Sequence, residues 1–393
     1  MNSAWPSGLG PVACVVGARP NFMKMAPILK AFAASPLCIP TLLIHTGQHY
    51  DRNMSDRIFH DLGLPNPDIN LEVGSGTHTV QTAEVMRRFE PVVDEHKPAC
   101  VLVVGDVNST LACTLVAVKK GVPVAHVEAG LRSNDRGMPE EINRVLTDQV
   151  ADLLYTTERS AHHNLAREGI SADRVKFTGN VMIDSLLSHR GRAPSPRESL
   201  GVAGADLAVL GDAAGYAVVT LHRPSNVDRA ETLGPLLAVL REISERLPLV
   251  FAMHPRTRAN IERFGLGATL ASPRIALLEP QGYLQMLGLM AGATAVLTDS
   301  GGLQEETTAL GVPCLTLREN TERPITVEQG TNTLVGRDRA SILGAVTEIL
   351  AGGGKRGRIP DLWDGHAAER IAADLGGWLV RRHQAAPAAS TES

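Results

Sequence analysis

The stretch PVAHVEAGLRSNDRGMPEEINRVLTDQV, residues 123–150, contains the alternation of elements that decides the fold. Its first seven residues form an apolar run typical of a buried strand, and residues 140–150 have the apolar spacing of a helix. The polar loop between them contains Gly130, Gly137 and Pro139, which interrupt regular structure. Because the same order recurs along the chain, the sequence predicts α/β architecture with parallel sheets.

The alternation occurs twice, so two doubly wound domains facing each other across a cleft are expected. The predicted strands lie at 11–17, 40–46, 99–105, 123–129, 152–157 and 174–179, then at 216–223, 247–255, 274–280, 293–300 and 313–319. Helices are predicted at 24–34, 80–96, 109–119, 140–150 and 160–168 in the first half. We expect an N-terminal domain over 1–190, a Gly- and Pro-rich connection over 191–212, a C-terminal domain over 213–370, and a final helix with a disordered tail over 371–393.

Composition favours small-molecule chemistry. The 393 residues carry a formal net charge of -4 with scattered basic residues, which argues against nucleic-acid or membrane-surface partners. No targeting segment or membrane span is evident. The odd number of cysteines and the absence of metal-ligand spacing predict buried thiols in a reducing cytoplasm. These cysteines are Cys14, Cys38, Cys100, Cys113 and Cys314.

Two stretches that follow predicted strands are suited to bind phosphate groups. GARPNFMK (17–24) places Arg19 and Lys24 around a helix start, although a turn with solvated cations would look the same and the GxGxxG spacing is absent. LTDSGGLQEE (297–306) combines Ser300 with two glycines, Gly301 and Gly302, at the start of another helix. Glu305 or Glu306 could then reach ribose hydroxyls, or Glu305 could simply cap the helix.

Three carboxylates stand near predicted strand ends. Asp106 in GDVNST could cap a helix instead, as could Asn108, and Glu140 could be a helix-dipole partner. Glu128 is harder to explain structurally, because a carboxylate that ends a buried strand needs a partner. The candidate partners are the loop arginines Arg132, Arg136 and Arg144.

Histidines follow three further predicted strands. His222 precedes Arg223 in HRPSN, and His254 lies near Arg256 in MHPR, both at the presumed cleft. His45 and His49 have an HxxxH spacing without an evident third ligand, so no metal site is predicted. Phosphate-binding features in both halves and carboxylates in the first describe a nucleotide-sugar site.

The chain resembles the bacterial non-hydrolysing UDP-N-acetylglucosamine 2-epimerases. The motifs that carry the resemblance occur in order over about 20–335: GARPNFMKMAP, HTGQH, GDVNST, HVEAGLRS, MPEEINRVLTDQ, TGNVMID, HRPSN, DSGGLQEE and TERP. The resemblance implies two Rossmann-like domains of glycosyltransferase-B type, the second of which binds UDP. It also implies a cytoplasmic homodimer in polysaccharide biosynthesis that inverts carbon two of a UDP-sugar without NAD or metal.

The resemblance also assigns residues. It implies that Asp106, Glu128, Glu140 and His222 are catalytic. The implied substrate-binding residues are Arg19, Lys24, Arg144, Arg223, Ser300, Gly301, Gly302, Glu306 and Arg323. One departure is HRPSN, where Ser225 stands in place of the glutamate in the HRxEN of many members.

Epimerisation without NAD requires elimination, because the hydrogen on carbon two of the sugar is not acidic. A base removes it as UDP leaves carbon one, and UDP adds back to the glycal after reprotonation from the other face. Spacing alone leaves open which carboxylate is the base. Other possibilities are a hydrolysing 2-epimerase, an epimerase of UDP-2,3-diacetamido-glucuronate, a retaining sugar transferase of glycosyltransferase-B type, and a nucleotide-sugar-binding regulator.

Overall fold

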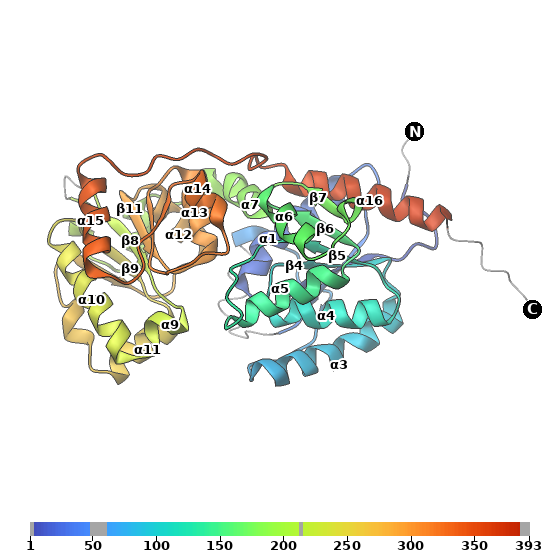
Figure 1. Cartoon of the computed structure of the whole chain (residues 1–393), viewed down its shortest axis with the longest axis horizontal. Coiled ribbons are helices and arrows are strands. Elements are labelled where there is room, and N and C mark those ends of the chain that lie inside the picture. The colour runs from blue at the N-terminus through green and yellow to red at the C-terminus, as the bar shows by residue number, and fades with distance from the viewer. Residues whose placement is uncertain (1–3, 48–60, 212–214, 386–393) are drawn as a thin grey trace, which may run out of the picture. The chain divides into compact units, whose positions relative to one another are not determined.

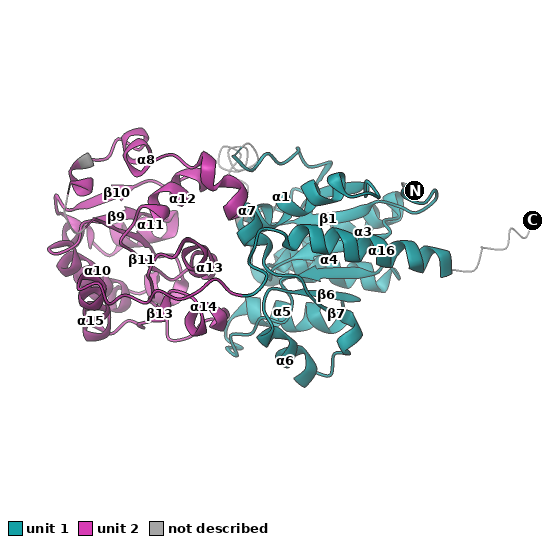
Figure 2. Ribbon diagram, turned by 90° about the horizontal axis from the view of Figure 1, so that it is seen from above, with its two compact units in different colours: residues 1–185, 361–393 teal, residues 186–360 magenta. Residues whose placement is uncertain are grey.

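The structure is a computed structural model that describes residues 4–47, 61–211 and 215–385. The chain divides into two compact units, coloured separately in Figure 2. Unit 1 comprises residues 1–185 and 361–393, and unit 2 comprises residues 186–360. Strands and helices alternate in each unit, as Figure 1 shows, which confirms the predicted α/β class.

Unit 1 is built on a seven-stranded parallel sheet in the order β3-β2-β1-β4-β5-β6-β7. Its strands are β1 (Val12–Val16), β2 (Thr41–His45), β3 (Ile69–Asn70), β4 (Cys100–Val104), β5 (Val124–Val127), β6 (Leu153–Thr156) and β7 (Val175–Phe177). The six predicted strands of the first half are confirmed. The two-residue β3 escaped prediction because it is too short to show a period.

Four of the five predicted helices of unit 1 begin earlier than predicted, because their first residues are polar or proline. They are α1 (Arg19–Ala34), α3 (His78–His96), α4 (Asn108–Lys119), α5 (Pro139–Val150), α6 (Ser160–Arg167), η1 (Ala172–Arg174) and α16 (Ala367–Ala385). Helix α7 (Val181–His189) starts in unit 1 and ends in unit 2. Phe89 of α3 and Leu154 of β6 belong to one apolar core that covers a face of the sheet.

Unit 2 repeats the architecture with six parallel strands in the order β10-β9-β8-β11-β12-β13. They are β8 (Ala217–Thr220), β9 (Leu249–Ala252), β10 (Ile275–Leu278), β11 (Ala295–Thr298), β12 (Cys314–Thr316) and β13 (Asn332–Leu334). The first five were predicted. Val219 and Val218 point into separate apolar cores, so both faces of the sheet are covered, as parallel sheets require.

The helical elements that cover this sheet connect its strands in succession. They are η2 (Arg190–Arg192), α8 (Pro196–Val202), η3 (Leu207–Leu210), α9 (Pro224–Val227), α10 (Ala230–Ser244), α11 (Pro255–Arg263), η4 (Gly267–Leu270), α12 (Tyr283–Ala291), α13 (Gly301–Leu310), α14 (Pro324–Glu328) and α15 (Arg339–Leu350). In both sheets the connections reverse direction beside the first strand, between β1 and β4 in unit 1 and between β8 and β11 in unit 2.

The observed domain boundaries differ from the expected ones. The segment expected as a connection, 191–212, belongs to unit 2 and contains α8, where Ser195 and Glu198 cap the helix reciprocally and Leu200 is buried. Its Gly- and Pro-rich composition gave no sign of α8 or of the 3-10 turn η3 that follows it. The described residues of the expected tail end at 385, so the remainder lies outside the structure described.

The C-terminal segment returns to unit 1 rather than extending unit 2. Helix α16 packs against α1, and the Asp184 carboxylate accepts hydrogen bonds from the backbone N–H groups of Ala367 (3.2 Å) and Ala368 (2.7 Å) at its start. Tyr155 Oη donates to Asp374 Oδ2 at 2.9 Å. Residues 361–370 were assigned to the second domain because neighbours in sequence were assumed to be neighbours in space.

The cysteines depart from prediction at one position. Cys38 is exposed, whereas Cys14, Cys100, Cys113 and Cys314 are buried. In the described part of the chain, no helix is both long enough and apolar enough to cross a membrane.

Candidate active site

The predicted acidic residues of unit 1 follow neighbouring strands of one sheet. Asp106 lies two residues after β4, and Glu128 directly follows β5. The carboxyl ends of parallel strands beside such a reversal point are where α/β proteins bind ligands. The topology therefore brings these carboxylates and the start of α1 to one edge of the sheet.

Glu128 has an unusual backbone and an ionic partner. Its φ of 75° is left-handed, and the backbone N–H groups of Glu128 and Ala129 both donate to the Tyr155 carbonyl at 3.0 Å. A non-glycine residue in this region costs on the order of 1–3 kcal/mol and often marks a functional site. The buried carboxylate forms an ion pair with Lys24, which is also buried. The ammonium group compensates the charge that burial would otherwise penalise.

This ion pair differs from the expected pairing. Glu128 was expected to pair with Arg132, Arg136 or Arg144, and Lys24 was expected to bind substrate. Arg132 instead pairs with Asp148 and Glu168, and Arg136 is exposed. The Lys24–Glu128 pair joins segments far apart in the sequence, so spacing gave no sign of it.

Arg144 holds Asp106 in place. Its Nη1 donates to Asp106 Oδ2 at 2.7 Å, and its Nε and Nη2 donate to Glu141 Oε2 at 3.1 and 2.8 Å. The Arg144 side chain is only 2% exposed, whereas the Asp106 side chain is 23% exposed. This geometry favours a positioning role for Arg144 over the predicted contact with substrate. Asn143 adds a bond from Nδ2 to the Asp106 carbonyl at 2.9 Å.

Glu141 anchors the loop that precedes α5. Its carboxylate accepts from the backbone N–H and hydroxyl of Ser133 (both 3.0 Å) and from the N–H of Asn134 (2.9 Å). Burial would raise the pKa of Glu141, but these bonds and the Arg144 charge lower it below its ordinary value. Sequence reasoning chose Glu140 and passed over Glu141. Glu140 is half-buried in the first turn of α5, and no hydrogen bond or ion pair joins it to the described side chains.

Asn21 organises the turn after β1, and sequence reasoning missed it. Its Oδ1 accepts from the N–H groups of Gly17 (3.2 Å) and Ala18 (2.9 Å), while its Nδ2 donates to the Val104 carbonyl at 2.9 Å. These bonds join the ends of β1 and β4. Arg19 is the first residue of α1, but its side chain lies outside the described structure.

In unit 2, Asp299 fixes the loop that carries His222 and Arg223. It follows β11, is fully buried, and accepts from the N–H groups of His222 (3.0 Å) and Arg223 (2.9 Å) and from Asn226 Nδ2 (3.1 Å). His222 Nδ1 lies 2.9 Å from Asp299 Oδ1. Burial would raise the pKa of Asp299, but the His222 interactions and backbone donors lower it overall. The rule of polar residues after strands would have identified this aspartate.

The loop after β12 gathers arginines around a buried carboxylate. Glu322 Oε2 accepts from Arg318 Nη2 at 2.7 Å, while Glu322 Oε1 lies 3.4 Å from Arg223 Nη2 and 4.0 Å from Arg323 Nη1. Burial opposes ionisation of Glu322, but the three guanidinium groups hold its pKa far below the ordinary value. Arg323 Nε also pairs with Glu305 Oε1 at 3.0 Å.

The predicted anion site at α13 lies beside this arginine cluster. Ser300 precedes the helix and Gly301 and Gly302 open it, so their backbone N–H groups lie in the helix's first turn. A Cβ atom added at Gly301 would collide with Glu322 Oε1, so a larger residue there would force this buried carboxylate to shift. Glu305 and Glu306 are both buried in the same helix.

The other predicted histidines have mixed outcomes. The His254 ring lies 5.7 Å from that of His222, while Arg256 forms an ion pair with Asp228. His45 is buried, and His49 lies outside the described residues. Among the described residues, no group of three or more His, Cys, Asp or Glu side chains could hold a metal ion.

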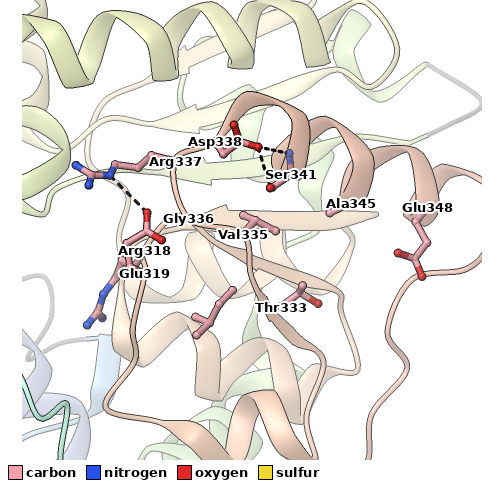
Figure 3. A pocket seen from close by; sticks show the side chains of 11 residues that line it. Arg318, Glu319, Thr333, Val335, Gly336, Arg337, Asp338, Ser341, Ala345 and Glu348 are labelled. Carbon is pink, nitrogen blue, oxygen red and sulfur yellow. Dashed lines mark hydrogen bonds and ion pairs between the residues drawn. The ribbon is translucent and has the colours of Figure 1, made fainter.

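A pocket of about 490 Å³ in unit 2, whose lining includes Arg318 of the arginine cluster, is shown in Figure 3. Asp338 accepts there from Ser341 N–H at 2.8 Å, and Arg337 Nε lies 3.8 Å from Glu319 Oε1. Its lining comprises Arg318, Glu319, Thr333, Leu334, Val335, Gly336, Arg337, Asp338, Ser341, Ala345 and Glu348. None of these residues was predicted to be functional.

Comparison with known proteins gives a consistent result. A family model described as UDP-N-acetylglucosamine 2-epimerase matches residues 34–376. The UDP-N-acetylglucosamine 2-epimerase of Methanocaldococcus jannaschii is 42% identical over 367 residues, which cover 93% of this chain and 98% of that protein. A Pseudomonas aeruginosa UDP-2,3-diacetamido-2,3-dideoxy-D-glucuronate 2-epimerase is 42% identical over 335 residues, 84% of this chain and 90% of that protein.

A solved structure supports the same assignment. The crystal structure of the M. jannaschii UDP-GlcNAc 2-epimerase in complex with UDP-GlcNAc and UDP matches with a TM-score of 0.85 at 41% identity, covering 93% of this chain and 99% of that chain. The resemblance inferred from the ordered motifs is thereby confirmed. The chain belongs to the UDP-N-acetylglucosamine 2-epimerase family.

Proposed function

We propose that this chain is an isomerase that interconverts UDP-GlcNAc and UDP-ManNAc by inverting carbon two of the sugar. Family membership supports the reaction class. The observation that carries the proposal is Glu128, a buried carboxylate with a left-handed backbone, paired with Lys24 beside the reversal point of the sheet. Strained backbone and buried, charge-paired carboxylates cluster at functional sites.

In the proposed elimination step, a carboxylate of unit 1 takes the proton from carbon two. The electron pair of that bond forms the double bond of the glycal as the bond from carbon one to the UDP oxygen breaks. Asp106, Glu128 and Glu140 are the proposed acid and base groups. Arg144 keeps Asp106 oriented, which is a requirement for efficient proton transfer.

In the return step, a proton is delivered to carbon two from the opposite face and UDP adds back to carbon one. This step requires that UDP stays bound after the bond breaks. The amides that open α13 together with Arg223, Arg323 and His222 are suited to stabilise a diphosphate. The proposed remaining contacts are Arg19, Lys24, Ser300 and Glu306.

The test is incubation with UDP-GlcNAc alone in deuterated water, followed by NMR. The expected product is a mixture of UDP-GlcNAc and UDP-ManNAc, both deuterated at carbon two. Free N-acetylmannosamine with stoichiometric UDP would show the hydrolysing reaction instead. Absence of any deuterium at carbon two would contradict the proposed substrate.

A second candidate substrate is UDP-2,3-diacetamido-glucuronate. The P. aeruginosa relative named for it matches this chain at 42% identity, the same value as the M. jannaschii UDP-GlcNAc 2-epimerase. Sequence identity to these two relatives therefore does not distinguish between the two candidate substrates. Parallel assays with both substrates at equal concentration would rank them by kcat/KM.

We also propose that the chain forms a homodimer through α5. Ile142, Leu146 and Val150 are 42%, 45% and 37% exposed and share one face at helical spacing. Light scattering after size exclusion should give twice the monomer mass. Leu146→Lys should shift this mass to the monomer, whereas Val202→Lys, at an exposed site in α8, should not. A monomeric wild type would contradict the proposal.

A cytoplasmic location and a role in supplying sugars for polysaccharide assembly complete the proposal. Nucleotide sugars are activated donors, so an isomerase of this kind would precede glycosyl transfer. The free, mostly buried cysteines are compatible with a reducing compartment.

A further inference from the structure

A fully buried histidine lies directly behind the acidic residues of unit 1. His126 of β5 is 0% exposed; its Nε2 is 2.8 Å from the Gly105 carbonyl oxygen and its Nδ1 is 2.6 Å from Asp148 Oδ1. A carbonyl oxygen only accepts, so Nε2 donates. Burial would raise the pKa of Asp148, but His126 and Arg132 lower it overall, which favours the carboxylate. Both hydrogen bonds are therefore satisfied only when both ring nitrogens carry protons.

The first of these bonds fixes the turn that carries Asp106. Gly105 has a φ of 68°, a conformation that favours glycine, and its N–H donates to the Val127 carbonyl at 3.0 Å. Its carbonyl accepts from His126, so β5 binds Gly105 through both its N–H and its carbonyl group. Asp106 is the next residue, and its direction depends on how this turn is held.

The second bond fixes the turn that follows Glu128. The Asp148 Oδ2 atom accepts from the Gly130 N–H at 3.0 Å and lies 2.8 Å from Arg132 Nη2. Arg132 is held in turn by Glu168 through two bonds of 2.8 and 2.6 Å. Glu128 lies between His126 and Gly130, so one aspartate restrains the chain on both sides of it.

We propose that His126 and Asp148 form a positioning pair that sets the geometry of Asp106 and Glu128 together. The inference rests on the proposed function, since it concerns the same reaction. The His126 ring has no exposed surface and therefore acts through the two turns. A displacement of about 1 Å in a reacting group can lower a rate by roughly 10²-fold, so this restraint has a measurable kinetic consequence.

Two variants separate the halves of the pair. In His126→Asn the amide lies where Nδ1 was, so it can still reach Asp148 but loses the Gly105 carbonyl. In His126→Gln the amide reaches the Nε2 position and keeps Gly105 but loses Asp148. Each should lower kcat on the order of 10- to 10²-fold while KM and the Kd for UDP stay within about twofold.

A matched control distinguishes positioning from general loss of stability. Tyr216→Phe removes a buried side-chain hydrogen bond, that from Tyr216 Oη to the Leu289 carbonyl at 2.6 Å in unit 2. It should lower the melting temperature and leave kcat within about twofold of wild type. Wild-type kcat in both His126 variants, or an equal loss of kcat in Tyr216→Phe, would overturn the inference.

A measurement on the unmodified protein tests the proposal even if the His126 variants fail to fold. With ¹⁵N-labelled histidine, NMR should show one ring in which both N–H protons exchange slowly with solvent, as expected for a buried ring that is hydrogen-bonded at both nitrogens. If every ring shows at most one protected N–H, the pair does not exist as described. This readout is independent of turnover. An inactive wild type would therefore contradict the proposed function, while NMR would still test whether His126 is hydrogen-bonded at both ring nitrogens.

Discussion

Each unit contains a histidine bound to a buried aspartate, and the two pairs differ in what the histidine can reach. His126 and Asp148 in unit 1 are fully buried, and both ring nitrogens bond within the protein. The His222 side chain in unit 2 is 37% exposed, and its Nδ1 atom lies 2.9 Å from Asp299 Oδ1. A histidine–aspartate pair therefore holds two turns in unit 1, whereas in unit 2 it leaves the histidine ring partly exposed.

The charges at the two sheet edges differ in the same way. Unit 1 places Asp106 and Glu128 after its strands and Glu140 at the start of α5, with Lys24 paired to Glu128 and Arg144 paired to Asp106. In unit 2 the guanidinium groups of Arg223, Arg318 and Arg323 surround one carboxylate. The shared topology decides where side chains gather, and residue type decides whether that place is suited to proton transfer or to anion binding.

The largest expected effect comes from removing the proton-transfer groups of unit 1. Glu128→Gln should lower kcat on the order of 10²- to 10⁴-fold, because the amide cannot exchange a proton with carbon two. Asp106→Asn and Glu140→Gln should fall in the same range. Calorimetry should show nearly unchanged UDP binding, since most of the proposed UDP contacts lie in unit 2 and those of Arg19 and Lys24 do not depend on proton transfer. Glu90→Gln, on the exposed surface of α3, is the control.

Wild-type turnover in Glu128→Gln would remove this residue from the acid–base set. Loss of UDP binding in the same variant would instead contradict the proposal that unit 1 transfers protons while unit 2 binds the diphosphate.

A smaller effect is expected from Gly301→Ala in unit 2. The added Cβ collides with Glu322 Oε1, so the first turn of α13 and the arginines around Glu322 must shift. We expect the Kd for UDP to rise on the order of 10- to 10²-fold, equivalent to about 1.4–2.8 kcal/mol. Gly344→Ala in α15 is the matched control, because a Cβ there meets open space. Equal Kd values for the two variants would mean that α13 does not contact the diphosphate.

Much of the fold and the rough position of the site follow from the sequence alone. Eleven strands were predicted from apolar runs, and the rule that ligands bind at strand carboxyl ends selected Asp106, Glu128 and Ser300. These features are local, so a single sequence reveals them. Strand β3 was missed because two residues show no period, and β13 was missed because its residues Asn332–Leu334 form no apolar run.

The sequence did not reveal which charged side chains form ion pairs with one another. Lys24 meets Glu128, and Arg144 meets Asp106, through contacts that only the folded sheet creates. Asp148 gave no signal because an aspartate within a helix is usually solvated. The final helix was predicted as a separate segment over 371–393, whereas α16 begins at Ala367 and its start is bound by Asp184 of unit 1.

The smallest expected effect concerns acid stability and compares Asp299 with Asp184. The pKa of Asp299 is depressed in the folded state despite its burial, so its contribution to stability is present above the unfolded value of about 3.9 and is lost as pH falls through the folded value. Burial raises the pKa of Asp184, so the folded state binds its proton more tightly and gains from acidification. We therefore expect opposite outcomes for the two substitutions. Between pH 5 and pH 3.5, the melting temperature should fall less in Asp299→Asn than in wild type and more in Asp184→Asn. Falls equal to that of wild type in both variants would mean that neither carboxyl group contributes to the acid sensitivity of its unit.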